Sequence, residues 1–231
     1  MTHQSRCHAE AALSHPTFRN WLTKPASTEL LIHGAADADE EGSGVSLLSA
    51  TLFQALGTKE RYIRLAFFCG LHTEADDRFV GGTAMVKSFI AQLLRQYDFD
   101  LTFLCNNDGS EVQLQRLRKG KVKDLCRLLT CLVRLLPANT KVVYIIDQIG
   151  TYECDEHENM MIRVLKTVLG QVRDSEMRCT VKVLATSDEA TDTVRDAFSD
   201  EDECLLDVEA LEYNEVEEYA IVESEGDSGE E

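Results

Sequence analysis

The chain of 231 residues lacks the segments that would place a protein in or across a membrane. No apolar run approaches the roughly 20 residues that a membrane-spanning helix needs, and residues 1–8 lack the apolar core of a secretory signal. The eight cysteines include no Cys-x2-Cys pair, which together with the missing signal indicates reduced thiols rather than a disulfide framework. We therefore expect a cytoplasmic protein without a membrane partner.

Basic residues are absent from the C-terminal part of the chain. Arg195 is the last Lys or Arg, and residues 199–231 hold 15 acidic residues. The 198 residues before them hold 26 acidic and 23 basic ones, so most of the net charge of −18 lies near the C-terminus. Because an acidic segment repels phosphate, it argues against direct nucleic-acid binding. We expect residues 211–231 to form an acidic helix and a disordered tail.

Short apolar runs alternate with helical patterns through most of the chain. Strands are predicted at 29–34, 63–69, 141–147, 180–187 and 204–208. Helices are predicted at 8–22, 46–56, 83–97, 122–136, 156–173 and 189–198. Strands separated by helices indicate the α/β class, with a doubly wound, mainly parallel five-stranded sheet and helices on both faces. We expect one domain over residues 29–210, preceded by a helical lead at 1–28.

The strand at 141–147 ends abruptly in Asp147, which is how a buried parallel strand delivers a carboxylate to the edge of a sheet. In nucleotide hydrolases such a strand carries the Mg²⁺-coordinating Asp of the Walker B element. Its partner is a loop of the form Gly-x4-Gly-Lys-Ser/Thr after the first strand. The loop here runs from Gly34 to Ser46 and contains no lysine. Four carboxylates stand in it instead, at Asp37, Asp39, Glu40 and Glu41.

The order of elements resembles that of the P-loop ATPases of the AAA+ and STAND type, and in particular the NACHT-like NTPase domains of fungi. The segments that carry the resemblance are Phe18-Arg-Asn-Trp21-Leu22, Phe67-Phe68-Cys69, Ile90-Ala-Gln92-Leu93-Leu94, Val142 to Asp147, and Leu184-Ala-Thr186-Ser187. They cover roughly residues 15 to 210, and their order and spacing are more specific than any one of them. The resemblance implies a P-loop NTPase-like sheet in the strand order 5-1-4-3-2.

The resemblance also implies a nucleotide site at the carboxyl edge of that sheet. Its residues would be Gly34, Gly44, Ser46 and Thr186 for the nucleotide, Asp147 for Mg²⁺, and Glu153 as a displaced catalytic base. Two of these residues have a plainer reading, because a serine at the start of a helix is often only its cap. An acidic residue near a helix N-terminus, as Glu153 is, often only initiates the helix.

The phosphate loop departs from the family pattern. If Gly44-Val45-Ser46 aligns with Gly-Lys-Ser/Thr, valine replaces the lysine, and the second glycine comes ten positions after the first where the motif needs five. We therefore expect a degenerate, non-hydrolysing NACHT/STAND-like domain that acts as a binding or assembly module, with no cofactor and with a protein partner or self-association. The alternative is an ATP-binding STAND-type NTPase with an unorthodox loop, which would use ATP and Mg²⁺.

Two further patterns leave alternatives open. Two Cys-x2-His pairs, Cys69/His72 and Cys154/His157, follow strands two and three and could form a zinc site if their loops met, which would make the protein a zinc-stabilised adaptor. The basic run at 116–123 could dock an acidic partner, including the acidic tail of this protein, or could be a solvated loop. It has no interleaved aromatic residues, so a nucleic-acid platform is not predicted there.

Overall fold

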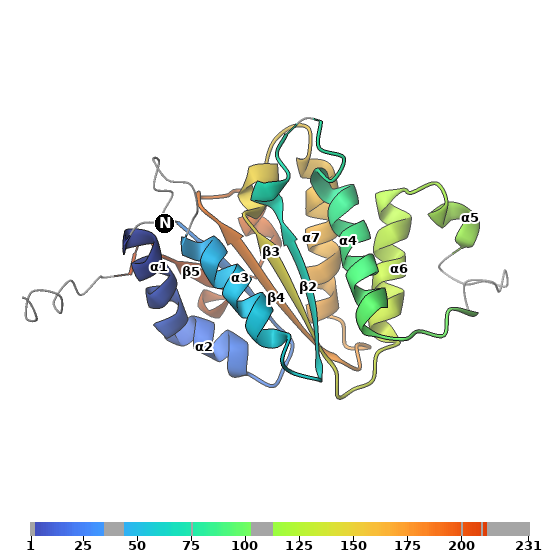
Figure 1. The fold of residues 1–231 in the computed structure, drawn as a ribbon, viewed down its shortest axis with the longest axis horizontal. Helices are drawn as coiled ribbons and strands as arrows, with labels where there is room; N and C mark the ends of the chain where they lie inside the picture. The colour runs from blue at the N-terminus through green and yellow to red at the C-terminus, as the bar shows by residue number, and fades with distance from the viewer. Residues whose placement is uncertain are drawn as a thin grey trace, which may run out of the picture.

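A single parallel sheet organises the molecule (Figure 1). The computed structural model describes residues 3–34, 44–74, 76–102, 113–199, 201–208 and 210–211. The strands are β1 (Thr28–His33), β2 (Tyr62–Phe68), β3 (Lys141–Asp147), β4 (Thr180–Ser187) and β5 (Leu205–Asp207). They lie in the order β2-β3-β4-β1-β5, and every pairing is parallel. The predicted order 5-1-4-3-2 and the parallel arrangement are confirmed.

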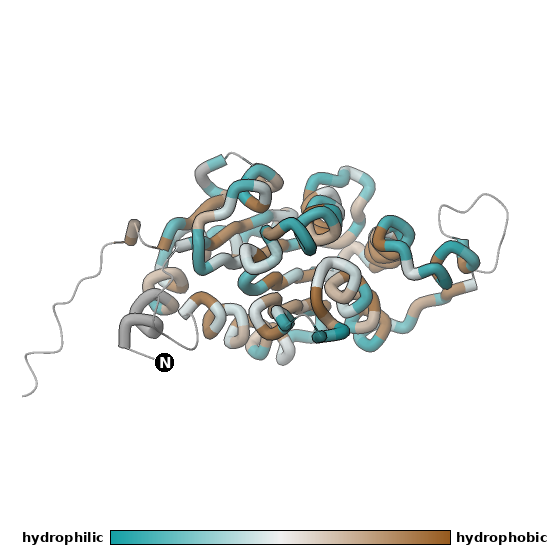
Figure 2. The backbone as a smooth tube through the Cα atoms, turned by 90° about the horizontal axis from the view of Figure 1, so that it is seen from above, coloured by the Kyte–Doolittle hydropathy of each residue, from teal (hydrophilic) through white to brown (hydrophobic). Residues whose placement is uncertain are grey.

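Helices cover both faces of this sheet (Figure 1), as predicted. One face carries α1 (His3–Ser14), α2 (Pro16–Thr23) and α3 (Gly44–Leu56). The other face carries α4 (Gly81–Gln96), α6 (Val122–Arg134) and α7 (Glu158–Val172), while the four-residue α5 (Leu114–Leu117) lies beyond α6. In the view of Figure 2, apolar segments of the tube gather between helices that are polar on the outside. No described helix is long and apolar enough to cross a membrane.

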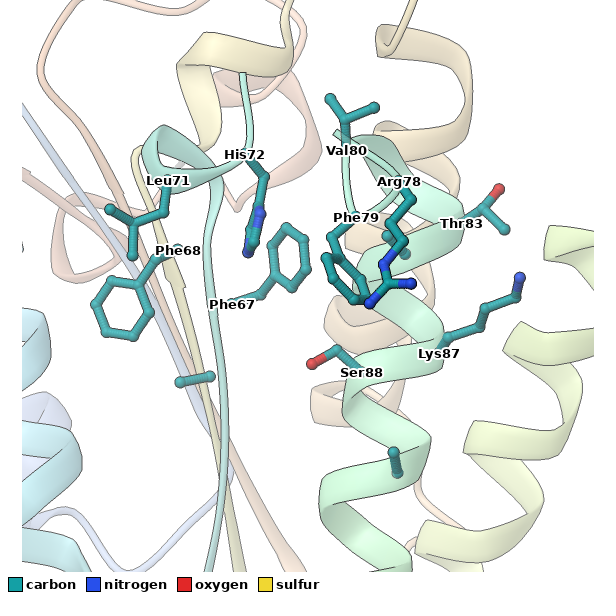
Figure 3. A pocket seen from close by; sticks show the side chains of 13 residues that line it. Phe67, Phe68, Leu71, His72, Arg78, Phe79, Val80, Thr83, Lys87 and Ser88 are labelled. Atoms are coloured by element: carbon teal, nitrogen blue, oxygen red, sulfur yellow. The ribbon is translucent and has the colours of Figure 1, made fainter. Parts of the chain in front are cut away.

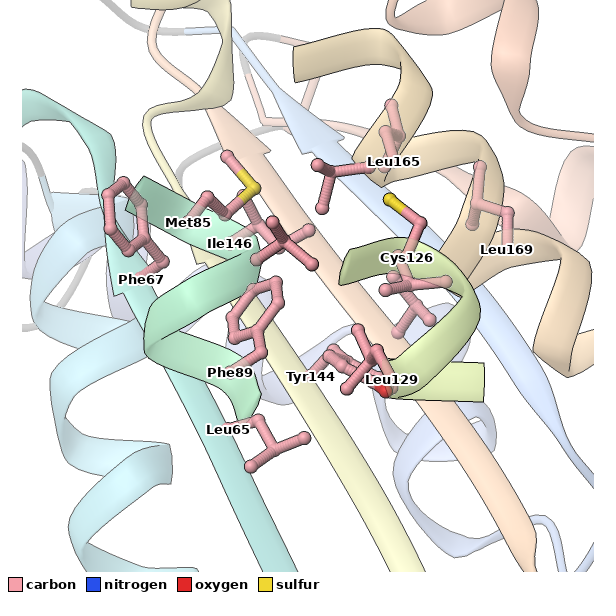
Figure 4. Packing of buried hydrophobic residues seen from close by; sticks show 14 of the residues in the cluster. Leu65, Phe67, Met85, Phe89, Cys126, Leu129, Tyr144, Ile146, Leu165 and Leu169 are labelled. Atoms are coloured by element: carbon pink, nitrogen blue, oxygen red, sulfur yellow. The ribbon is translucent and has the colours of Figure 1, made fainter. Parts of the chain in front are cut away.

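Strand β3 shows why both faces must be covered. Side chains alternate along a strand, and here the alternating positions are all apolar. Tyr144 and Ile146 belong to the core on the α4–α6–α7 face, whereas Val143 and Ile145 belong to the core on the α1–α3 face, and all four are at most 1% exposed. In Figure 4 the Phe89 ring meets Tyr144 edge to face, with ring centroids 5.2 Å apart. Ile145 and Ile146 are therefore buried on opposite faces of the sheet.

Two helix predictions need correction, and one helix was not predicted. The single helix predicted at 8–22 is two helices, because Pro16 cannot continue a helix and instead opens α2 at its first position. His15 caps α2 by accepting a hydrogen bond from the Thr17 amide at 3.3 Å. The helix predicted at 189–198 is reduced to a 3-10 turn over Arg195–Ala197. Helix α5 was not predicted.

The outer edge of β2 is hydrogen-bonded by side chains of α4. The Gln96 amide donates to the Arg64 carbonyl at 2.8 Å and accepts from the Arg64 amide at 3.1 Å. Gln92 makes the same pair of bonds with Ala66, at 2.7 and 2.9 Å. Because these backbone groups have no neighbouring strand, the two glutamines satisfy donors and acceptors that would otherwise face solvent.

Candidate functional site

Three of the predicted site residues meet at the carboxyl edge of the sheet. Asp147 is the last residue of β3, Thr186 lies near the end of the adjacent strand β4, and Ser46 lies in the first turn of α3. The Ser46 hydroxyl donates to Asp147 Oδ2 at 2.7 Å, and the Thr186 hydroxyl donates to Asp147 Oδ1 at 2.8 Å. Residues from three distant parts of the sequence therefore converge on one carboxylate, as parallel strands and the following helix allow.

The carboxylate of Asp147 is almost completely removed from solvent. Asp147 is 2% exposed, and burial raises the pKa of its carboxyl group because the charged form loses its hydration. Hydrogen bonds from Ser46, Thr186 and Ser49 lower this pKa, and the negative charge of Asp188 raises it, but burial remains the largest effect. None of the ion pairs among the described residues involves Asp147.

Two residues that the sequence did not single out complete the environment of Asp147. Gln148 has a left-handed backbone, with φ 51°, and its amide donates to the Thr186 hydroxyl at 3.1 Å. Its side-chain amide donates to Asp188 Oδ2 at 2.6 Å, and the other oxygen of Asp188 is buried and has no hydrogen-bond partner among the described residues. Gly70 makes room for this side chain, since a Cβ there would lie 1.5 Å from Gln148 Oε1. The position of Asp188, two residues beyond Thr186, is the signal that could have indicated it.

The two ends of the predicted phosphate loop are described, but the loop itself is not. Gly34 is buried and has φ 100°, a conformation that favours glycine. Gly44 is the first residue of α3. Val45, which takes the place of the lysine if Gly44-Val45-Ser46 aligns with Gly-Lys-Ser/Thr, is 1% exposed and belongs to the core on the α1–α3 face. The predicted carboxylates at 37–41 lie outside the described residues.

Glu153 holds a turn of the backbone. Its carboxylate accepts from the amides of Asp192, at 3.1 Å, and Val194, at 3.2 Å, and also from the amide of Thr193. These bonds satisfy the amides with a carboxylate in place of helical partners, which explains why the helix predicted at 189–198 does not form. A carboxylate that serves three backbone donors is less free to take a proton from water.

The two Cys-x2-His pairs are not brought together as a metal site. The described residues contain no group of three or more His, Cys, Asp or Glu side chains that could hold a metal ion. Burial, and to a lesser extent the charge of Asp147, raise the pKa of the Cys69 thiol well above its usual range, which opposes the thiolate that zinc requires. His72 Nδ1 lies 2.6 Å from the Asp77 carboxylate. Cys154 is exposed, and His157 precedes α7.

A separate hollow of about 700 Å³ lies between the edge strand β2 and α4. In Figure 3 the rings of Phe67, His72 and Phe79 face one another inside it. The His72 ring centroid is 5.2 Å from that of Phe67 and 5.9 Å from that of Phe79. Arg78 and Lys87 also line the hollow. None of the predicted nucleotide-site residues lines this hollow.

The chain was compared with known structures, with curated proteins and with family models. A Walker-type ATPase of Pyrococcus abyssi has a similar structure, with 13% sequence identity and a TM-score of 0.34 over 78% of this chain. The match covers 43% of the length of that ATPase chain. No curated protein matches the sequence. The family model described as "Nephrocystin 3, N-terminal" matches residues 8–188. The chain therefore belongs to the Nephrocystin 3, N-terminal family.

Proposed function

We propose that this P-loop NTPase-like domain is a binding or assembly module that does not hydrolyse nucleotides. The observation that carries the proposal is the place of Val45. An active loop presents a lysine ammonium to the β- and γ-phosphates, and this charge offsets theirs. Val45 stands at that position in the alignment and is packed into the core, at 1% exposed. It offers neither a charge nor a donor.

The charges around the site support the same proposal. Asp147 and Asp188 face each other closely enough for the charge of Asp188 to raise the pKa of Asp147. The loop between Gly34 and Gly44 adds four carboxylates. A polyphosphate brought to this edge would meet negative charge on both sides, and the repulsion would have to be offset by a cation.

An ATP-binding domain with an unorthodox loop is the second candidate, and one contact favours it. The Ser46 hydroxyl and the Asp147 carboxylate are 2.7 Å apart, so two oxygen ligands of the kind that Mg²⁺ prefers lie together. In this candidate, Gly34, Gly44 and Thr186 would border the nucleotide, Asp147 would hold Mg²⁺, and a base such as Glu153 would have to leave its three amides to act.

In the zinc-adaptor candidate, by contrast, metal analysis of the purified protein would find about one zinc per chain.

A nucleotide titration separates the first two candidates. We expect calorimetry with ATP or GTP, with and without Mg²⁺, to show no saturation up to about 1 mM, which corresponds to roughly 4 kcal/mol of binding free energy. We also expect no release of phosphate.

Asp147→Ala tests whether any observed binding belongs to this site, and Asp155→Ala is the matched control, because Asp155 is an exposed carboxylate outside the site. A micromolar dissociation constant that is lost in Asp147→Ala and kept in Asp155→Ala would overturn the proposal in favour of the ATP-binding domain.

A further inference from the structure

Helices α5 and α6 carry a cluster of positive charge that has almost no negative counterpart beside it among the described residues. The cluster lies on the segment from Arg116 to Arg127, where α5 turns through Gly120, with φ 63°, into α6. Its exposed cations are Arg116, Arg118, Lys119, Lys121 and Lys123. None of these five takes part in an ion pair within the described residues, while Arg127 pairs with Asp124 at 3.4 Å. Similar charges so close together repel one another, and an anionic partner would relieve this repulsion.

These side chains converge on a hollow surface. A cleft of about 330 Å³, here called the cationic cleft, is lined by Arg116, Lys119, Lys121, Lys123, Asp124 and Arg127. A neighbouring hollow of about 540 Å³ shares Lys119, Lys121 and Lys123 and adds Arg163 of α7. The first turn of α6 also presents the positive end of its dipole here. The surface is therefore shaped and charged to hold an extended acidic segment.

The chain contains such a segment. Residues 212–231, here called the acidic segment, hold nine Asp or Glu and no Lys or Arg. Four apolar residues at 219–222 stand within it, so that it combines carboxylates with a short apolar stretch. Its charge is complementary to that of the cationic cleft, and charge complementarity orients and accelerates association more than it strengthens it.

The cationic cleft and the end of the described chain lie at opposite ends of the molecule (Figure 1). The described chain ends at Leu211, shortly after β5, which forms one edge of the sheet. In Figure 1, β5 lies at one end of the long axis and α5 at the other. This separation favours contact between copies over contact within one copy.

We propose that the cationic cleft of one copy binds the acidic segment of a second copy, so that copies associate head to tail. Two different surfaces meet in such a contact, and the resulting pair of copies still has one free cleft and one free acidic segment. Association therefore continues to a ring or an open chain. The proposal deepens the assembly role proposed above and rests on it, but it makes no use of the nucleotide site.

The test uses two complementary full-length variants in nucleotide-free buffer. In the first, the nine carboxylates of the acidic segment are changed to their amides. In the second, Lys119→Glu, Lys121→Glu and Lys123→Glu reverse the charge of the cleft. We expect wild-type protein to gain mass with concentration in sedimentation at about 0.05 M salt and to associate at least about tenfold more weakly at about 0.5 M, where screening is stronger. Each variant alone stays monomeric, and an equimolar mixture stops at a one-to-one pair.

A charge-matched control separates the cleft from the effect of net charge. Lys59→Glu, Arg95→Glu and Lys166→Glu alter three exposed cations elsewhere and change the net charge equally. We expect this control to associate as the wild type does. Monomeric wild type at low salt, variants that fail to pair when mixed, or a control that loses association would each overturn the proposal. The proposal would also be overturned if the contact formed within one copy, in which case wild type would be a monomer and both variants would be more expanded monomers. It would likewise be overturned if an RNA oligonucleotide bound the cleft while a peptide of residues 212–231 did not.

The nucleotide titration can fail without affecting this result. If the protein bound ATP but the two variants still paired, the non-hydrolysing function would be wrong and the head-to-tail contact would stand. If the protein ignored ATP and the variants did not pair, only the contact would fall.

Discussion

The two ends of the central sheet each bury a carboxylate, but only one of these carboxylates is paired with a described cation. At the amino end, Glu29 of β1 is 4% exposed and accepts two hydrogen bonds from the guanidinium of Arg173 and one from the Ser199 amide, at 2.8 Å. At the carboxyl end, Asp147 is 2% exposed and has only hydroxyl donors. One end is neutralised from within the chain, and the other keeps a carboxylate that no described cation balances.

This difference supports a structural role for the amino end and the binding role that we propose for the carboxyl end. A buried carboxylate paired with a guanidinium ties β1 to the end of α7, so the pair fixes the fold. A buried carboxylate without a cation costs stability, and such sites cluster where ligands bind. Substitutions at the two ends should therefore have effects of opposite sign.

The largest effect is expected for Arg173→Ala. Removing the guanidinium leaves Glu29 buried with one amide donor, and an uncompensated buried charge typically costs about 3–5 kcal/mol. We expect about 3 kcal/mol of lost unfolding free energy in urea, since half of the Arg173 side chain is exposed. Arg134→Ala is the matched control, because its pair with Asp174 at 2.8 Å lies nearer the surface and should contribute at most about 1 kcal/mol. Equal losses of unfolding free energy in the two variants would show that the buried pair of Glu29 and Arg173 contributes no more to stability than the surface pair.

A second, smaller effect concerns Lys182, also near the amino end. Its side chain is buried and donates to the Trp21 carbonyl and to the Thr28 hydroxyl, and burial lowers the pKa of Lys182 to about 8. Between that value and the usual value near 10.5, the unfolded chain binds the proton and the folded chain does not, so stability rises with pH. We expect wild type to gain roughly 2 kcal/mol relative to Lys182→Met between pH 7 and pH 10. A constant difference between the two proteins over this range would contradict the prediction.

The smallest effect is expected at the carboxyl end, for Asp147→Asn. The amide removes a charge that burial disfavours, so we expect stability at pH 7 to stay equal or to rise by about 1 kcal/mol. Because the pKa of Asp147 is raised, the folded wild type takes up a proton before the unfolded chain does as the pH falls, and wild type then recovers stability. The advantage of Asp147→Asn should therefore shrink between pH 7 and pH 4 in thermal melts. Asp155→Asn, an exposed carboxylate, should show no such trend.

The sheet could be predicted from the sequence because its signals are local. The bounds of β3 and β4 were predicted to the residue, since each is a short apolar run followed by polar residues at the sheet edge. The convergence of Ser46, Asp147 and Thr186 was expected from the family resemblance, together with the parallel strand order that it implies. The break before Pro16 was also present in the sequence, and it was missed because the apolar pattern continues across it.

Other features depend on contacts that no local pattern reveals. Glu29 and Arg173 are 144 residues apart, and nothing in either segment specifies the other. The turn at 192–194 is set by Glu153, whose effect on those amides comes only from the folded arrangement. Gln148 and Asp188 were missed for the same reason, since their contact spans 40 residues.

The glutamines of α4 restrict how copies of this protein can come together. A sheet edge with free amides and carbonyls acts as a template on which a foreign strand can be added, and growth of this kind leads to aggregates. Gln92 and Gln96 already form hydrogen bonds with the amides and carbonyls of Ala66 and Arg64, so these backbone groups of β2 cannot pair with an added strand. Assembly is thereby directed away from backbone pairing and toward side-chain surfaces, where charge can select the partner and salt can release it.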